Sequence, residues 1–160
     1  MHEPIWQGVV RTIWLTPTRG ADPKLVDEAE AVASVGLRGD RFFKKSNARD
    51  PARQLTLIAS EALKAAADEH GVDLHDGRHR RQIVVEGVPL NDLIGQEFMV
   101  GDVHVRGVEL CEPCKRMARL SGEPGAIKAL VHRGGLNVEL LSGGMICTNA
   151  LVRTIAKTPG

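Results

Sequence analysis

Residues 107–120, GVELCEPCKRMARL, place two cysteines between a strand-like run and a predicted helix. Pro113 suits the first position of a helix, where its missing N–H is not needed, and Cys114 then falls in the first turn. The positive end of the helix dipole and the two basic residues that follow favour a thiolate over a thiol at Cys114. We therefore expect any chemistry to centre on Cys114, with Cys111 as a secondary candidate.

Other interpretations of the cysteines stay open on the residues alone. Cysteines near a strand end can be small buried hydrophobic residues. The C-x-x-C spacing of Cys111 and Cys114 also matches half of a zinc site, but no second C-x-x-C or paired histidine motif stands at a usable spacing. A redox pair of the thioredoxin kind belongs near a βαβ pattern, which the neighbouring segments lack. Cys147 lies in a strand-like run, where a core position is expected.

The composition is that of an ordinary globular chain. Of 160 residues, 42% are hydrophobic and 26% charged, and 21 basic residues nearly balance 20 acidic ones. The resulting net charge of +1 gives no global attraction to a nucleic-acid backbone or an anionic membrane. No tyrosine and only 3% aromatic residues leave few platforms on which bases could stack. We expect one domain over residues 1–160, with neither nucleic acid nor membrane as a partner.

The N-terminal stretch and the cysteine count indicate the cytoplasm. Residues 1–10, MHEPIWQGVV, lack the basic region, apolar run and cleavage site of a signal peptide. No apolar segment approaches the ~18–20 residues that span a bilayer. Three cysteines cannot all pair within one chain, and a domain of this size does not need disulfides, so reduced thiols in a reducing compartment are expected.

Strand signals outnumber helix signals along the chain. Alternating or β-branched runs between Gly, Pro and Asp turns predict strands at residues 8–15, 32–35, 53–58, 82–85, 97–100, 103–110, 136–141 and 145–155. Residues 18–52 otherwise read as a long loop. A helix is predicted from its cap at Ser60 to about His70, where Gly71 ends it, with short helices at 114–120 and 126–132. This pattern predicts a mainly β fold, an antiparallel or mixed barrel with a few short peripheral helices.

Basic residues gather in three segments. Residues 38–53 hold six basic side chains against two acidic ones, residues 75–81 read HDGRHRR, and HRGG follows at 132–135. Arginine forks bind phosphate and carboxylate bidentately, and neighbouring glycines let a backbone approach an anion closely. Each segment alone could be solvated surface. Convergence of the three on the cysteines would instead indicate an anion site.

Five motifs follow one another along the chain: GLRGDRFF (36–43), RQLTLIASEAL (53–63), HRRQIVVEGVPLNDLIGQEFMVGDV (79–103), GVELCEPCKRM (107–117) and HRGGLNVELLSGG (132–144). Together they resemble the stand-alone bacterial MOSC domains, a family named for the C-terminal domain of molybdenum cofactor sulfurase. The resemblance covers about residues 6–153 and implies a β-rich barrel. It also implies the role of Cys114, because the family's cysteine after a proline is proposed to carry sulfur as a persulfide or to ligate the molybdenum of a bound cofactor. Cys111 matches only the small stand-alone members.

The same resemblance implies residues that bind the cofactor. Asp40 matches the family's glycine-aspartate turn near the site, and Arg53 matches the basic residue that opens the next strand. Arg80 and Arg81 match the arginine pair before the strand that follows, and Arg133 matches a further motif. These five residues are expected to hold a pterin phosphate or another anion.

The expected function follows from these implications. The chain would bind a molybdenum–pterin cofactor (molybdopterin) or carry activated sulfur, as a sulfur transferase or as a component of a molybdenum-cofactor-dependent oxidoreductase. It contains no pyridoxal phosphate site and no iron–sulfur or flavin module, so a pyridoxal-phosphate cysteine desulfurase or separate redox proteins are the expected partners. One alternative is a non-catalytic barrel that binds an anionic small molecule while its cysteines merely pack. Another is a C-x-x-C thiol oxidoreductase with Cys111 as the resolving partner.

Overall fold

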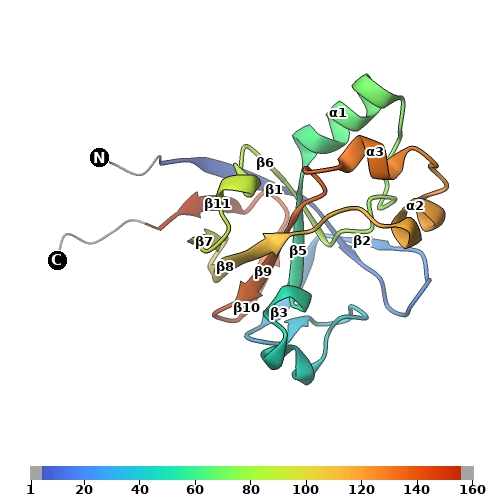
Figure 1. Cartoon of the computed structure of the whole chain (residues 1–160). Coiled ribbons are helices and arrows are strands. Elements are labelled where there is room, and N and C mark those ends of the chain that lie inside the picture. The colour runs from blue at the N-terminus through green and yellow to red at the C-terminus, as the bar shows by residue number, and fades with distance from the viewer. Residues whose placement is uncertain (1–4, 156–160) are drawn as a thin grey trace.

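The computed structural model describes residues 5–155, in which seven strands close into a barrel (Figure 1). Their order around the barrel is β11-β7-β8-β9-β5-β6-β1, and β11 also pairs with β1. Their bounds are β1 Gln7–Leu15, β5 Leu55–Ala59, β6 Ile83–Glu86, β7 Glu97–Val100, β8 Val103–Leu110, β9 Leu136–Leu140 and β11 Leu151–Thr154. Neighbouring strands are antiparallel except β5 and β6, which run parallel. The predicted mixed, mainly β barrel is confirmed.

Residues 1–4 and 156–160 lie outside the described part of the chain, so the start of the N-terminal stretch considered above is not described. Both ends of the described chain leave the barrel on the side away from α2 (Figure 1). Within residues 5–155, no helix is long and apolar enough to cross a membrane.

Residues 18–52, predicted as a loop with a strand at 32–35, contain more regular structure than expected. β2 (Lys24–Val26) pairs with β1, and β3 (Glu28–Val32) lies between β4 (Gly36–Leu37) and β10 (Gly144–Cys147). The observed strand ends where the predicted one begins. Its main partner β10 lies far along the chain, and a local sequence pattern cannot show such a pairing.

The predicted strand 145–155 is two strands, β10 and β11, separated by a turn. Asn149 stands in that turn with a left-handed φ of 70°, a conformation that asparagine tolerates better than most residues. Because both strands are rich in β-branched and apolar residues, only the turn residue marks the boundary between them.

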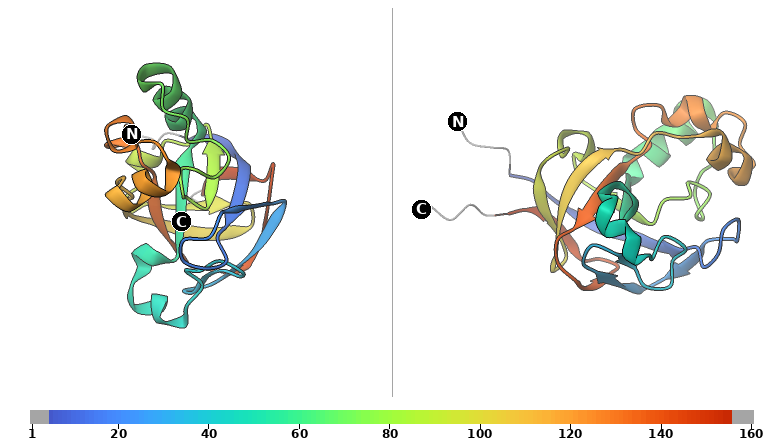
Figure 2. Two further views of the ribbon diagram at one scale, coloured as in Figure 1. Left: turned by 90° about the vertical axis from the view of Figure 1, so that its right-hand side faces the viewer. Right: turned by 60° about the horizontal axis from the view of Figure 1, so that its bottom comes forward.

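Three α-helices lie together on one side of the barrel, while the 3-10 helices η1 and η2 lie on another (Figures 1 and 2). The bounds are α1 Ser60–His70, α2 Lys115–Ser121 and α3 Ala126–Leu130, with η1 Lys45–Arg49, η2 Pro51–Arg53 and η3 Leu90–Asp92. α1 ends as predicted at Gly71, which has a left-handed φ of 63°. Its N-cap, however, is Ala59. Ser60 is the first helical residue, and its hydroxyl bonds Glu61 instead of a backbone N–H.

Two apolar cores position the helices against the barrel. The larger core fills the barrel interior and includes Phe98 and Leu57. The second lies between the helices and the outside of β5 and β6, where Ile58 packs with residues such as Met117 and Leu130. β5 is therefore buried on both faces, and it fixes α2 and α3 beside one end of the barrel.

Candidate functional site

A cavity of about 450 Å³ lies between the loop after β4, the segments that precede β5 and β6, and the start of α2. Its lining consists of Thr16, Asp40, Arg41, Phe42, Asp50, Ala52, Arg53, Thr56, Arg80, Arg81, Gln82, Glu109, Cys111, Cys114, Arg116, Met117, Leu120 and Asn137. A cavity of this size accommodates a small-molecule or cofactor-sized ligand. The first two basic segments and the cysteine segment thus meet at one place.

Cys114 lines this cavity with an exposed side chain. It is the N-cap of α2 rather than a residue of its first turn, so Pro113 lies outside the helix and not at its first position as predicted. The backbone of Cys114 is extended (φ −131°, ψ 167°), and its carbonyl accepts the first bond of the helix, 3.1 Å from Ala118 N. Its thiol has no hydrogen-bond partner among residues 5–155, so the sulfur is open to a ligand.

Cys111 is half-buried on the same wall. Its N–H donates to the carbonyl of Gly135 at 2.8 Å, which continues the ladder of β8 and β9 beyond their ends. Burial raises the pKa of the Cys111 thiol above its ordinary value, and Arg81 only partly opposes this. Cys111 is therefore held as a thiol, while Cys114 is the cysteine that a ligand can reach.

Cys147 is exposed, so its predicted place in the core is wrong. β10 alternates, and Ile146 fills the core while Cys147 faces outward beside Glu28, with 3.7 Å between Sγ and Oε2. The alternation was visible in the sequence, but the face that points inward depends on the distant partner β3.

Arg81 holds the cysteine loop in place. Its side chain is buried, and its Nε donates to Gly134 O at 2.8 Å while Nη2 donates to Cys111 O at 3.1 Å and to Glu112 O at 3.4 Å. Gly134 is needed for this arrangement, because a Cβ there would lie 2.4 Å from the Cys111 oxygen. The structure thus places the Arg81 guanidinium mainly against main-chain carbonyls of the loop that carries both cysteines.

His79 fixes the turn that carries the arginine pair. Its Nδ1 accepts the N–H of Arg81 at 2.9 Å, and its ring packs edge-on against Trp14. Burial, assisted by the charge of Arg81, lowers the pKa of His79 from its ordinary 6.5 to about 3. The imidazole is therefore neutral at pH 7, and Arg80 between the two stands at a left-handed φ of 60°.

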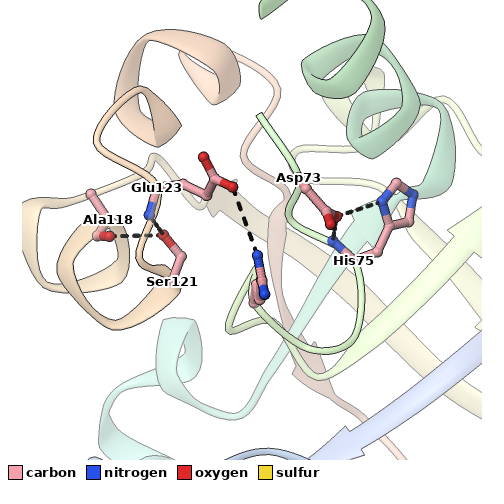
Figure 3. A network of polar contacts seen from close by, with 6 residues as sticks. Asp73, His75, Ala118, Ser121 and Glu123 are labelled. Atoms are coloured by element: carbon pink, nitrogen blue, oxygen red, sulfur yellow. Dashed lines mark hydrogen bonds and ion pairs between the residues drawn. The ribbon is translucent and has the colours of Figure 1, made fainter. Parts of the chain in front are cut away.

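Contacts at the far end of α2 join this turn to the helix (Figure 3). Ser121 Oγ donates to Ala118 O at 2.8 Å and accepts the N–H of Glu123 at 3.1 Å. The Glu123 carboxylate in turn lies 3.7 Å from Arg78. The segment with Arg80 and the helix with Arg116 are thereby held together.

Asp40 organises the opposite wall. Its Oδ1 accepts the N–H of Thr16 at 2.8 Å, and its Oδ2 accepts the N–H of Phe42 at 3.1 Å and Nε2 of Gln82 at 2.9 Å. Gln82 Oε1 then accepts the N–H of Thr56 at 2.8 Å. Burial raises the pKa of Asp40, and these hydrogen bonds oppose the rise. The carboxyl group of Asp40 therefore joins three segments around the cavity.

Four arginines of the lining have no ion pair with a carboxylate of residues 5–155. Arg81 donates to main-chain carbonyls, which leaves three whose guanidinium groups form no hydrogen bond within the described residues: Arg41, Arg80 and Arg116. Burial and the repulsion of Arg116 lower the pKa of both Arg41 and Arg80. The Arg41 guanidinium lies over the Phe42 ring, 4.2 Å from its centre. Like charges brought together and partly desolvated are relieved by a bound anion. We call these three residues the arginine triad.

The other predicted arginines are placed differently. Arg53 lines the cavity but pairs with Asp50 at 2.9 Å. Arg133 does not line it: its Nη2 bonds Glu69 at 2.9 Å and its Nε bonds the Ala129 carbonyl at 2.7 Å, beside a separate hollow of about 240 Å³. The third basic segment contributes to the site through the backbone of Gly134 instead.

Several lining residues were not predicted as site residues. The sequence signal for Arg41 was its place in the first basic segment, and the signal for Arg116 was its place as one of the two basic residues that follow Cys114. Gln82, Glu109 and Asn137 carry no comparable signal, because what brings them to the cavity is strand pairing between distant segments.

Fold and site together define a β-barrel protein that presents a cysteine beside an arginine-lined cavity. A family model described as the MOSC domain matches residues 44–153, and the chain belongs to this family. No curated protein sequence matches the chain at a significant level.

Several solved structures have a similar fold. The YuaD protein of Bacillus subtilis has a TM-score of 0.77 at 17% identity, covering 94% of this chain and 100% of its own. YiiM of Geobacillus stearothermophilus has a TM-score of 0.73 at 17% identity, covering 96% and 77%. YiiM of Escherichia coli has a TM-score of 0.65 at 15% identity, covering 95% and 72%. At these identities the likeness concerns the fold.

Proposed function

We propose that the cavity binds an anionic ligand of the molybdenum–pterin type and that Cys114 supplies the reactive sulfur, as a molybdenum ligand or as a persulfide carrier. One observation carries the proposal: the exposed thiol of Cys114 shares a cavity with an arginine triad that has no carboxylate partner among residues 5–155. The membership of the chain in the MOSC family supports the same ligand class.

The residues present fit such a group. A thiolate is a soft ligand that suits a soft metal, and arginine forks suit a phosphate. Among residues 5–155 no group of three or more His, Cys, Asp or Glu side chains could hold a metal ion, so Cys114 would be the donor from this chain. When bound, the molybdenum–pterin group would supply redox chemistry. The arginine triad would hold its phosphate, and Arg81 would keep the cysteine loop in register.

As a persulfide carrier, Cys114 would receive sulfur from a partner such as a pyridoxal-phosphate cysteine desulfurase. The Cys114 thiolate would attack the terminal sulfur of the donor's cysteine persulfide. A sulfur–sulfur bond then forms on Cys114, the donor's sulfur–sulfur bond breaks, and the donor leaves as a thiolate. The positive cavity would stabilise the thiolate before this step and the anionic persulfide after it.

The test compares Cys114→Ser with Cys147→Ser, which removes an exposed cysteine on β10 away from the cavity. Molybdenum and cyanide-releasable sulfur are quantified on each purified protein after co-expression with a cysteine desulfurase and in a molybdate-replete host. We expect wild type and Cys147→Ser to carry one of the two loads. Cys114→Ser should carry at least about tenfold less, because the loaded atom is bonded to its sulfur.

Other outcomes identify the alternatives. If Cys114→Ser and wild type carry equal loads, or none, while phosphate still binds, the protein is a binding barrel and the role of Cys114 is wrong. If Cys111→Ser and Cys114→Ser lose a disulfide-reducing activity equally, the cysteines form a thiol oxidoreductase pair.

A further inference from the structure

Charge is distributed unevenly over the chain. Three segments that contribute to the cavity wall, residues 38–53, 75–81 and 115–121, hold twelve basic and three acidic side chains. The other 130 residues hold nine basic and seventeen acidic side chains. The net charge of +1 thus combines +9 in these segments with −8 in the rest of the chain. Such a separation of charge orients a charged partner as it approaches and directs it to the cavity.

Five of these basic side chains border the cavity from two sides, exposed and without an ion pair within residues 5–155. Three stand at η1 and two on α2: Lys44, Lys45, Arg49, Lys115 and Arg119. The lining residues Asp50 and Leu120 directly follow Arg49 and Arg119 in the chain. η1 and α2 themselves lie on different sides of the barrel (Figures 1 and 2). We call these five residues the basic rim.

Cys114 lies within the basic rim. Lys115 directly follows it, and its exposed thiol lines the cavity. Transfer of sulfur between two proteins brings a cysteine of the partner within bonding distance of Cys114 Sγ, so the partner's surface must cover the residues around that atom. An acidic surface is attracted at this place and a basic one is repelled.

Nucleic acid is the other polyanion that suits a basic surface, but the aromatic side chains are not free to stack on bases. Trp6, Trp14 and Phe98 pack on the two apolar cores. An arginine lies over each of the remaining rings, Phe42 and Phe43. These five are all the aromatic residues of the chain. Binding of a single strand uses exposed rings as platforms, which this surface does not offer.

Exposed apolar side chains lie on the two helices beside the basic rim. Leu120 is exposed on α2, and Ile127 and Val131 are exposed on α3 and at its end. α2 and α3 pack against each other. Protein interfaces combine apolar contacts with polar ones at their edge, whereas contacts to a nucleic-acid backbone go mainly to phosphate oxygens. These residues therefore favour a protein as the partner.

We propose that the basic rim docks an acidic surface of a partner protein that exchanges sulfur with Cys114, so that the partner's reactive cysteine is flanked by Asp and Glu residues. The inference rests on the proposed function, because the carrier role requires another protein to reach this cysteine. Attraction between opposite charges raises association rates about 10- to 10³-fold and weakens as the ionic strength rises.

The test measures how fast Cys114 of the full chain, in a Cys147→Ser background, reacts with two activated peptides. Each contains one cysteine as a mixed disulfide with thionitrobenzoate, flanked on both sides by three Glu residues in the acidic peptide and by three Gln residues in the neutral one. The Cys114 thiolate attacks the peptide sulfur, a sulfur–sulfur bond forms, and thionitrobenzoate leaves as a coloured thiolate. Mass spectrometry assigns the adduct to Cys114.

The ratio of the acidic rate to the neutral rate reports docking separately from the reactivity of the thiol. We expect the acidic peptide to react at least about fivefold faster at about 0.1 M salt. The ratio should fall below about twofold at about 1 M salt, because the screening length shortens from about 10 Å to about 3 Å.

Two double variants remove two positive charges each from the basic rim. Lys44→Gln/Lys45→Gln changes the η1 side, and Lys115→Gln/Arg119→Gln changes the α2 side. Each should lower the rate ratio at least about threefold, because the acidic peptide is attracted less while the neutral peptide is unaffected by charge. The ratio also corrects for any change that the loss of Lys115 makes to the Cys114 thiol itself.

Lys64→Gln/Arg153→Gln is the matched control. It removes the same number of charges from exposed residues of α1 and β11 that do not line the cavity. Its rate ratio should stay within about 1.5-fold of wild type. An equal fall in the control and in the rim variants would mean that net charge alone attracts the peptide, and this would overturn the docking surface.

Other outcomes separate the docking surface from the proposed function. If Cys114 reacts with both peptides at equal rates, the docking surface is wrong, and the carrier role depends only on the sulfur load of Cys114. If Cys114 reacts with neither peptide, the reactive thiol of the proposed function fails and the docking surface fails with it.

Fluorescence anisotropy with a 20-nucleotide DNA, single-stranded and duplex, tests the other class of partner. At about 0.15 M salt we expect a Kd weaker than about 1 μM, as for non-specific binding. A tighter Kd that both rim variants lose would overturn the protein partner and assign the basic rim to nucleic acid.

Discussion

The guanidinium of Arg81 is buried against three main-chain carbonyls, whereas that of the adjacent Arg80 lines the ligand cavity among other arginines. The difference arises from the left-handed backbone of Arg80, which turns consecutive side chains to different sides. Arg81 therefore acts through the cysteine loop as a positioning residue. Arg80 is the member of the pair that can meet an anion.

We predict that Arg81→Met mainly lowers stability, whereas Arg80→Met mainly weakens anion binding. Arg81→Met should lower the free energy of unfolding by about 2–4 kcal/mol, because three carbonyl oxygens lose a charged donor. It should also speed iodoacetamide labelling of Cys111, whose loop is no longer held. Arg80→Met should change stability by less than about 1 kcal/mol, since it also removes repulsion from Arg116, but weaken phosphate binding about fivefold or more. Urea denaturation and calorimetry measure both effects, and equal stability losses in the two variants would contradict this division.

At the residue scale, residue chemistry made part of the site predictable. A cysteine and clustered arginines have chemical properties that can be recognised from residue type alone. The types and spacing of Cys114 and the arginines therefore predicted an anion site beside a reactive sulfur. Glu109 and Asn137 meet only because β8 and β9 pair in one register, with an irregularity that shifts it. Asp40 was predicted to hold the cofactor, and its hydrogen bonds to Thr16 and Phe42 depend on a turn that sequence alone does not define.

At the scale of elements, local patterns located most strands, because alternation and turn residues are properties of short segments. β7 and β8 have the predicted bounds. The strand predicted at 32–35 lies earlier in the chain, as β3, and the strand predicted at 145–155 is two strands, β10 and β11. The bounds of β3 and β10 follow from their pairing with each other, which a local pattern does not show. The starts of α1 and α2 also differ from prediction, because a helix cap depends on the backbone geometry of a single residue. The N-cap of α1 is Ala59 and not Ser60, and Cys114 is the N-cap of α2 and not its first helical residue.

The cysteine loop depends on a glycine of another element. A Cβ at Gly134 would lie 2.4 Å from the Cys111 oxygen and 3.0 Å from Pro113 Cδ. We predict that Gly134→Ala destabilises the protein by about 1–3 kcal/mol, because the backbone at Cys111 must move to admit the methyl group. It should also change the labelling rates of both cavity cysteines, which mass spectrometry of iodoacetamide adducts measures.

Gly125→Ala is the control for this substitution. Its nearest neighbour would be Val72 Cγ2 at 3.1 Å, a side-chain atom that can shift without moving the cysteine loop. The control should leave cysteine labelling at the wild-type rate. Unchanged labelling in Gly134→Ala as well would show that the close approach does not position the cysteines.

At the scale of the whole molecule, burial of titratable groups links the site to the stability of the fold. The neutral ring of His79 lies under the arginine turn and against Trp14, which packs on the second core. The Asp40 carboxyl group is buried on the other wall. Burial displaces the two pKa values in opposite directions, upward for Asp40 and downward for His79, so their contributions to pH-dependent stability also have opposite signs.

His79 should make the fold sensitive to acid in a range where carboxylates are still ionised. Its pKa is about 3 in the folded chain against an ordinary 6.5, so its contribution is fully present above pH 6.5 and is lost as the pH falls toward 3. The loss amounts to about 2 kcal/mol by pH 5.

We predict that His79→Gln, whose amide oxygen can still accept the Arg81 N–H, loses about 2 kcal/mol less of its free energy of unfolding than wild type does between pH 7 and pH 5, as measured by urea denaturation. The Asp40 contribution cancels in this difference, and His70→Gln, which alters an exposed histidine, should retain the wild-type loss. Equal losses in wild type and His79→Gln would mean that the imidazole is charged in the folded protein, and that the arginine turn does not depend on its neutral form.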